Sequence, residues 1–184
     1  MAPELGTARL TGTLVGPGDV DDVLAIRLSN PDRLLRTDGS AGMAGHYDRE
    51  MLERDLALAD LDHERRFFVL RARAAGQPGT GQGGPRPAVG ILDVLMTNPG
   101  DGHPWIGAVE IAVEHQRQGY GKEAVLAAER YLAQRHAGGH PVRAALHADY
   151  ARARAFARAC GFAERPAPPG LRLPATWVLA ELAA

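Results

Sequence analysis

Residues 106–124 read IGAVEIAVEHQRQGYGKEA, and this stretch decides how the rest of the chain is interpreted. It begins as a strand-like apolar run, turns through Gly119 and Gly121, and continues as an amphipathic helix. Backbone N–H groups in the first turn of a helix have no intrahelical partners, and the helix dipole is positive at that end. Because glycines let a ligand approach the backbone closely, the stretch predicts a site for an anion such as a diphosphate.

The turn and helix resemble the acetyl-CoA-binding motif of the GNAT superfamily of N-acetyltransferases, whose signature is Gln/Arg-x-x-Gly-x-Gly/Ala. Gln116, Gly119 and Gly121 fill that signature. The Glu123-Ala124 pair that follows is most similar to the branch that includes the ribosomal-protein N-terminal acetyltransferases. The resemblance covers residues 89–162 well and the rest of the chain loosely. It implies acetyl-CoA as a co-substrate and an amine as the acceptor.

Length, charge and cysteine content set broad bounds. The 184 residues fit one domain, 1–184, with a full core. A net charge of −1 gives no argument for nucleic acid or an anionic membrane as a partner. A single cysteine, Cys160, excludes an internal disulfide framework and fits a reducing compartment. No signal peptide or membrane-spanning run is visible, so we expect a cytoplasmic enzyme that is a monomer or a homodimer.

The order of elements predicted from periodicity is similar to that of the GNAT fold. We therefore expect an α/β (α+β) domain with a mixed, mostly antiparallel sheet of about six to seven strands and four helices. A Pro/Gly-rich segment at 76–87 is interpreted as a flexible hairpin tip. The strands are expected at 8–15, 66–71, 88–96, 105–113, 142–146, 162–164 and 176–182, and the helices at 19–30, 46–61, 119–137 and 151–160.

The resemblance also implies where the cofactor binds. The family interrupts the strand at 105–113 and splays it from the strand at 142–146, so that the pantetheine arm lies between them. The family's spacing between this strand and the motif glutamine, Gln116, places the interruption at Val109, Glu110 and Ile111. A rival register places it at Ile111, Ala112 and Val113. The diphosphate contacts are expected from the backbone of Arg117, Gln118, Gly119, Tyr120, Gly121 and Lys122, with side-chain donors from Gln118 and Lys122.

A second family motif, Asn-x-x-Ala/Ser followed by Gly-Phe, is partly present. Ala153, Gly161 and Phe162 match it, whereas Tyr150 stands where the family usually has Asn. The resemblance places Tyr150 and Ala153 beside the pantetheine arm. The departure at Tyr150 removes one expected polar contact to that arm.

The family's usual proton carriers are absent from this sequence. Ala157 occupies the position of the tyrosine that many members use as an acid, and Trp105 and Ala145 occupy those of a glutamate base. Candidate proton carriers are therefore Glu110 beside the expected thioester, His147 at the end of its strand, and Tyr150. No His or Cys spacing suggests a metal site.

The chemistry of the acceptor limits how serious this absence is. A lysine amine with a pKa near 10.4 is neutral in about one of several thousand molecules at about pH 7. An α-amine with a pKa of about 7.7–8.0 is neutral in roughly 10–20% of molecules. An amine of low pKa can therefore attack directly in a ternary complex, with positioning supplying much of the rate.

Alternative functions remain open from the sequence. The acceptor could be a protein N-terminus, an amino acid, a polyamine or an amino-group antibiotic. The rival readings are a non-catalytic acyl-CoA-binding module and an acyltransferase that uses longer acyl groups. A nucleotide-binding protein is disfavoured, because Gly119 and Gly121 lack both the third glycine of a dinucleotide fingerprint and the Gly-Lys-Ser/Thr ending of a P-loop.

Overall fold

One mixed sheet runs through the whole molecule. The computed structural model describes residues 5–37, 47–62, 64–73, 86–135 and 139–182. The described strands lie in the order β1-β2-β3-β4-β5-β6-β8-β7, and all neighbours are antiparallel except β5 and β6. The strands are β1 (Leu5–Gly6), β2 (Leu10–Leu14), β3 (Arg65–Ala72), β4 (Ala88–Leu95), β5 (Trp105–Ile111), β6 (Val142–His147), β7 (Phe162–Arg165) and β8 (Trp177–Leu182). The expected sheet type is confirmed, with eight strands rather than six to seven.

The described chain holds five α-helices, one more than predicted. They are α1 (Val20–Leu28), α2 (Pro31–Thr37), α3 (Arg49–Leu61), α4 (Tyr120–Arg135) and α5 (Ala151–Ala159), with short 3-10 turns at Pro17–Asp19 and Val113–His115. The extra helix is α2. Asn30-Pro31 does end α1, but proline is also favoured at the first position of a helix, so a new helix begins there. The predicted loop at 76–87 lies almost wholly outside the described residues.

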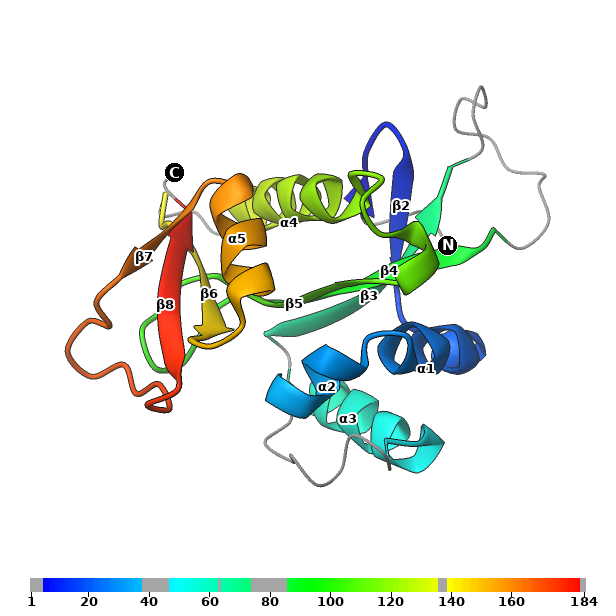
Figure 1. The fold of residues 1–184 in the computed structure, drawn as a ribbon, viewed down its shortest axis with the longest axis horizontal. Helices are drawn as coiled ribbons and strands as arrows, with labels where there is room; N and C mark the ends of the chain where they lie inside the picture. Colours follow the sequence, from blue (N-terminus) through cyan, green and yellow to red (C-terminus); the bar gives the residue numbers. More distant parts are fainter. Residues whose placement is uncertain (1–4, 38–46, 63, 74–85, 136–138, 183–184) are drawn as a thin grey trace.

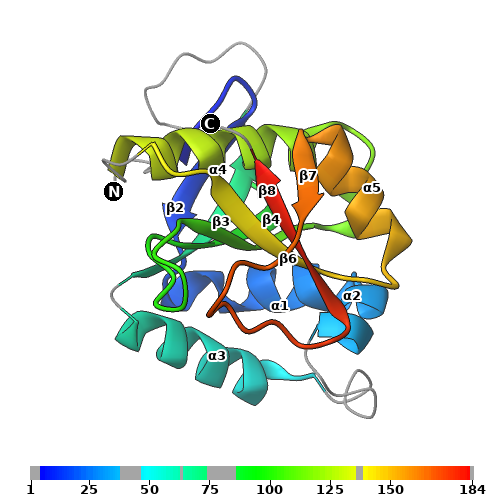
Figure 2. The same ribbon diagram turned by 90° about the vertical axis from the view of Figure 1, so that its left-hand side faces the viewer.

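Helices cover both faces of the sheet and create two cores. Figures 1 and 2 show α4 and α5 on one side, and α1, α2 and α3 on the other. Phe68, Leu92 and Leu132 belong to the core under α4 and α5. Val23 and Ile91 belong to the core under α1 and α3. Neighbouring residues of β4, Ile91 and Leu92, thus face opposite cores, which explains why that strand is a nearly continuous apolar run.

Strands β5 and β6 diverge as the family resemblance predicts. Within the described residues, the two strands share one paired position, Trp105 with Arg143. Asp101 ties this corner together: it accepts hydrogen bonds from Trp105 Nε1 at 3.1 Å and from Arg143 Nη1 at 3.0 Å. Beyond that corner the strands separate, and the separation creates space between them.

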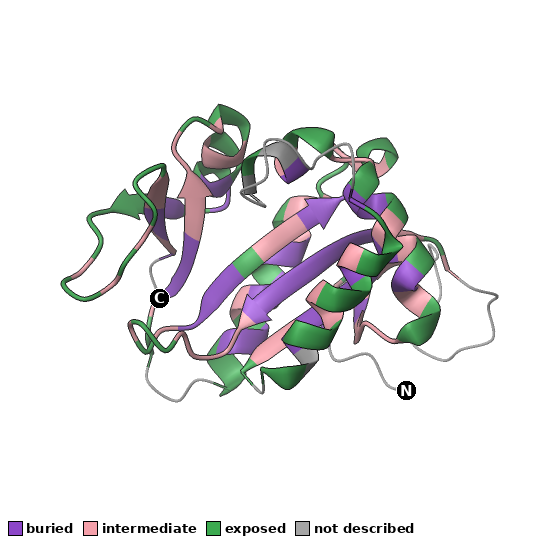
Figure 3. Ribbon diagram, turned by 90° about the horizontal axis from the view of Figure 1, so that it is seen from below, coloured by how far each residue is buried: buried purple, intermediate pink, exposed green. Residues whose placement is uncertain are grey.

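The interruption of β5 lies nearer the start of the strand than predicted. Val109, Glu110 and Ile111 pair in regular register with β4, and the register shifts instead between Asp93 and Val94 of β4, opposite Gly107. Seen from below, the central strands are largely buried, while an exposed stretch interrupts β5 (Figure 3). A bulge places two residues of one strand against one of its neighbour. The irregularity within β5 therefore does not lie at the predicted triplet 109–111. The rival register, 111–113, falls where β5 ends and the 3-10 turn at Val113–His115 begins, so the pairing does not test it.

Candidate functional site

The glycine loop, residues 116–121, leads from β5 into α4. Arg117 and Gly119 have φ angles of 63° and 88°, both in the left-handed region. Left-handed backbone next to other conformations curls successive N–H groups into a concave, anion-binding surface. Helix α4 begins at Tyr120, so N–H groups of its first turn have no partner within the helix. The loop therefore has the backbone shape and the dipole that a diphosphate requires.

Gln116 holds the start of this loop. Its Nε2 donates to the Ile111 carbonyl at 2.8 Å and to Asn30 Oδ1 at 2.7 Å. Its Oε1 accepts a hydrogen bond from Arg152 on α5. Gln116 thus connects the end of α1, the end of β5 and α5, which gives a structural reason for a glutamine at the first position of the motif.

Arg9, between β1 and β2, braces the same loop from another side. Its Nη1 donates to the Gln118 carbonyl at 2.9 Å, and its Nε lies 2.8 Å from Glu123 Oε2. In a trans peptide the C=O and N–H point in opposite directions, so the N–H of Gly119 points away from Arg9. Burial raises the pKa of Glu123, but hydrogen bonds from Thr7 and Arg9 outweigh it and hold that pKa below its usual value.

A cavity of about 490 Å³ occupies the space between β5 and β6. Four residues predicted for the site line it: Val109, His147, Tyr150 and Ala153. Trp105 and Trp177 also lie in its wall. We call this space the β5–β6 cavity. The structure thus brings the predicted pantetheine and proton-carrier positions together, apart from Glu110 and Ile111.

Glu110 lies beneath β5 and away from this cavity. Its side chain is 1% exposed, with Arg33 Nη1 at 3.0 Å and Arg27 Nε at 3.8 Å from Oε1. Arg33 belongs to α2 and lines the cavity, so Glu110 fixes a wall of the cavity from behind. On the same helix, the Arg36 guanidinium lies 5.4 Å from the ring centre of Tyr150.

The remaining predicted residues lie in or next to the glycine loop. Ile111 is buried, and its side chain comes within 3.7 Å of the position that a methyl group on Gly121 would take. Lys122 is exposed at the start of α4. The Gln118 side chain donates to the Glu114 carbonyl at 3.1 Å, so its amide is engaged within the loop.

An ion pair at the bulge was not predicted from the sequence. Asp93 is buried on β4 and accepts two hydrogen bonds from Arg65, at 2.9 and 2.6 Å. The bonds to Asp93 outweigh burial and raise the pKa of Arg65. A methyl group at Gly107 would lie 2.9 Å from Asp93 Oδ2, so a residue without a side chain lets the carboxylate reach the bulge. The available signal was one charged residue inside the apolar run AVGILDVL.

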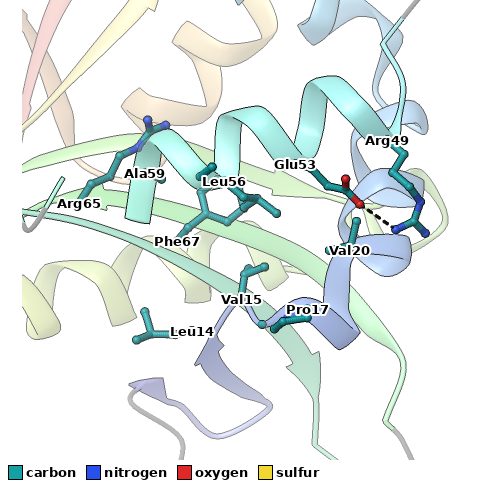
Figure 4. A pocket seen from close by; sticks show the side chains of 12 residues that line it. Leu14, Val15, Pro17, Val20, Arg49, Glu53, Leu56, Ala59, Arg65 and Phe67 are labelled. Atoms are coloured by element: carbon teal, nitrogen blue, oxygen red, sulfur yellow. Dashed lines mark hydrogen bonds and ion pairs between the residues drawn. The ribbon is translucent and has the colours of Figure 1, made fainter. Parts of the chain in front are cut away.

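A second cavity, of about 450 Å³, lies between α3 and the neighbouring ends of β2 and β3 (Figure 4). Apolar side chains such as Val15, Leu56 and Phe67 form its walls. An ion pair between Arg49 and Glu53, at 3.2 Å, stands at one end, and Arg65 lines the other end. Arg65 also lines the β5–β6 cavity, so the two spaces share one wall residue.

The structural features fit a coenzyme A thioester. The curled backbone at Arg117 and Gly119 suits a diphosphate, and the space between the splayed strands suits an extended arm. The Phe156 ring lies 3.1 Å from where a methyl group on Gly121 would sit, so glycine keeps the backbone there accessible beside an aromatic wall. Among the described residues, no group of His, Cys, Asp and Glu side chains is placed to hold a metal ion.

Comparison with known proteins identifies the family of the chain. The model of the acetyltransferase (GNAT) family matches residues 33–162, which contain the glycine loop and most of the β5–β6 cavity. No curated protein matches the sequence significantly.

In the described part of the chain, no helix has the length and apolar character needed to span a membrane.

Solved structures share the fold over nearly the whole chain. An acetyltransferase from Thermus thermophilus is 27% identical, with a TM-score of 0.64 over 94% of this chain and 97% of its own. Spermidine N-acetyltransferase from Vibrio cholerae, in complex with CoA and spermine, is 15% identical, with a TM-score of 0.66 over 95% and 94%. RimL, a ribosomal L7/L12 α-N-protein acetyltransferase in complex with CoA, is 13% identical, with a TM-score of 0.70 over 96% and 95%.

Proposed function

Because the chain belongs to the acetyltransferase (GNAT) family, we propose that it transfers an acetyl group from acetyl-CoA to a primary amine, at a protein N-terminus or on a small molecule. One observation carries the proposal: the β5–β6 cavity opens where the two strands diverge, and β5 leads through one short 3-10 turn into the glycine loop. A thioester arm lying between the strands would therefore bring its carbonyl to the cavity while its diphosphate lies on the loop.

Positioning supplies most of the chemistry in this proposal. The amine enters the β5–β6 cavity and attacks the thioester carbonyl directly, which forms the new C–N bond and releases the thiolate. The bulge at Gly107 interrupts the β4–β5 ladder, so backbone there is available to polarise the carbonyl oxygen. Holding the two reactants in the right geometry is worth effective molarities of up to about 10⁵–10⁸ M.

Proton movement is assigned to the two candidate residues that line the cavity. We place His147 as the group that takes the proton from the attacking amine, and Tyr150 as the donor to the leaving thiolate. Glu110, the third candidate, is buried against Arg27 and Arg33, so we give it a positioning role. It holds α2 and thereby Arg33 at the wall of the cavity.

The charges of the cavity favour an acceptor with one amine over a polycation. Two arginines, Arg33 and Arg65, and two aspartates, Asp62 and Asp93, line it, so formal charges balance. Trp105 and Trp177 add apolar walls. A polyamine needs an excess of carboxylates, whereas an α-amine on a largely apolar body fits a balanced, aromatic cavity.

A non-catalytic acyl-CoA-binding module is the second candidate, and one observation favours it. Ala157, where many relatives have a tyrosine acid, is buried on α5 and cannot transfer a proton. Binding of acetyl-CoA by calorimetry, followed by thiol release with a panel of amines, separates the two functions. Amine-dependent thiol release supports the transferase, tight binding without release supports the module, and tighter binding of succinyl-CoA supports a longer acyl donor.

A further inference from the structure

Two side chains of α5 face the glycine loop and have no role in the function proposed above. Arg152 is exposed and donates to Gln116 Oε1. Phe156 is one helical turn further along and lies against Gly121. Residues four apart share one face of a helix, so α5 presents a cation and an aromatic ring together to the loop.

The orientation of Gln116 explains why Arg152 is held at this place. Both hydrogen bonds of Gln116 Nε2 run to fixed groups, the Ile111 carbonyl and Asn30 Oδ1. The amide oxygen is therefore turned toward α5, where Arg152 meets it. A neutral amide oxygen is a weaker partner for a guanidinium than an anionic oxygen is.

Arg152 differs from the other arginines of its helix. Arg154 and Arg158 both pair with Glu164, at 2.8 and 3.5 Å. In the described chain, Arg152 has no carboxylate within ion-pair distance. Its charge is thus not neutralised by an acidic side chain, although it lies beside backbone that is shaped for an anion.

We propose that Arg152 binds the diphosphate of the coenzyme A thioester, and that its guanidinium exchanges the Gln116 amide oxygen for phosphate oxygens when the thioester binds. This inference rests on the proposed function. A guanidinium matches phosphate geometry with two parallel hydrogen bonds, which an amide oxygen cannot satisfy. The loop then supplies amides from one side, Arg152 supplies charge from α5, and Phe156 closes the apolar side of the groove.

Calorimetric titration with acetyl-CoA tests the proposal on the full chain. Arg152→Gln should weaken binding by at least about tenfold, because a hydrogen bond to a charged group is worth more than one between neutral groups. Arg152→Lys should recover part of that loss, because lysine keeps the positive charge but cannot donate two parallel hydrogen bonds to a phosphate. Arg158→Gln is the matched control on the same exposed helix and should bind as the wild type does.

Truncated ligands identify the group that Arg152 recognises. The loss in Arg152→Gln should be equal for acetyl-CoA and for 3′-dephospho acetyl-CoA. The KM for S-acetylpantetheine, which has no phosphate, should not change. Unchanged acetyl-CoA binding, a loss that disappears with the 3′-dephospho ligand, or an equal loss with S-acetylpantetheine would each overturn the proposal. A wild-type chain that binds no acetyl-CoA would instead overturn the proposed function itself.

Discussion

Gly121 is the residue whose missing side chain keeps the backbone of the glycine loop accessible. It lies in the first turn of α4, beside Phe156 and Ile111. Gly119, two residues earlier, has a different role, because its φ of 88° shapes the loop and a methyl group there would lie 3.0 Å from Arg9 Nη2. The two glycines of the motif therefore serve distinct purposes, one for approach and one for backbone conformation.

Gly121→Asp should separate folding from binding. A carboxylate in the first turn of a helix is favourable to the helix by about 0.3–1 kcal/mol. The same carboxylate repels a diphosphate, so acetyl-CoA affinity should fall at least about tenfold below that of Gly121→Asn, which has the same size without the charge. Calorimetry and thermal melting of the two variants test this, and equal affinities would refute the anion site.

Glu110 is the candidate residue whose role was hardest to predict from the sequence, because the sequence does not show on which face of the sheet its side chain lies. Its place in β5 was predictable, but the face that it occupies depends on the bulge at Gly107. A shift of one residue in register turns every later side chain to the other face of the sheet. The residues that meet Glu110, Arg27 and Arg33, lie in helices whose positions follow from packing, so no spacing in the sequence reveals the contact.

Glu110→Gln should destabilise the fold more than it affects chemistry. Removing one charge of a buried ion pair typically costs about 3–5 kcal/mol, although Arg27 keeps its ion pair with Asp55 at 3.6 Å. We expect a lower unfolding free energy in urea, with thiol release retained at temperatures where the variant is folded. A stable variant that has lost amine-dependent release would contradict the positioning role and restore Glu110 as a proton carrier.

At the scale of elements, the β1–β2 hairpin is attached to α4 through one carboxylate. Glu123 accepts hydrogen bonds from the Arg9 backbone at 2.9 Å and from the Arg9 Nε at 2.8 Å, and from the Thr7 hydroxyl. Strand β1 was not predicted, because Leu5–Gly6 is too short to show periodicity. Its existence depends on pairing with β2, which local sequence does not encode.

This attachment should make stability depend on pH in one direction. The folded pKa of Glu123 lies below its ordinary value, so its contribution is present above about pH 4.3 and is lost as pH falls through the folded pKa. Urea unfolding should show the wild type more stable than Glu123→Gln at pH 6, with the difference shrinking toward pH 3. If the difference in unfolding free energy between the two proteins stayed constant over this pH range, the charge of Glu123 would not be the cause of the added stability.

The space between β5 and α5 should be the path of the pantetheine arm. Ala153 lines the β5–β6 cavity, whereas Ala155 of the same helix is exposed. Ala153→Trp fills the path, and overpacking costs of about 1–3 kcal/mol correspond to roughly 5–150-fold weaker binding of acetyl-CoA. Ala155→Trp is the control and should bind normally. Equal binding by both variants would place the arm elsewhere.

At the scale of the whole molecule, the order of strands and helices followed from local patterns except for β1 and α2. The strand at Trp105–Ile111, the glycine turn and the helix at Tyr120–Arg135 all lie close to their predicted bounds. The contacts between packed elements could not be predicted from local patterns. The meeting of α2 with β5, the Asp93–Arg65 pair and the approach of α5 to the loop join segments far apart in sequence, and these contacts decide what lines the cavity.

Intrinsic fluorescence should report ligand binding directly. The sequence contains two tryptophans, and both Trp105 and Trp177 line the β5–β6 cavity. Acetyl-CoA should therefore change the emission at saturation, and Trp105→Phe and Trp177→Phe should each retain part of the change. An emission spectrum that is insensitive to a ligand whose binding calorimetry has measured would place that ligand outside the cavity.

The single paired position between β5 and β6 has a consequence for how the protein holds together. Elsewhere the backbone ladder itself resists separation of neighbouring strands, but at this seam the two halves of the sheet are joined mainly at one corner. A thioester bound between β5 and β6 would make non-covalent contacts with both strands, in place of the backbone hydrogen bonds that are missing there. Since any ligand that binds only the native state adds RT ln(1 + [L]/Kd) to its stability, a higher concentration of the acyl donor would raise the free energy of unfolding of the protein as well as its turnover.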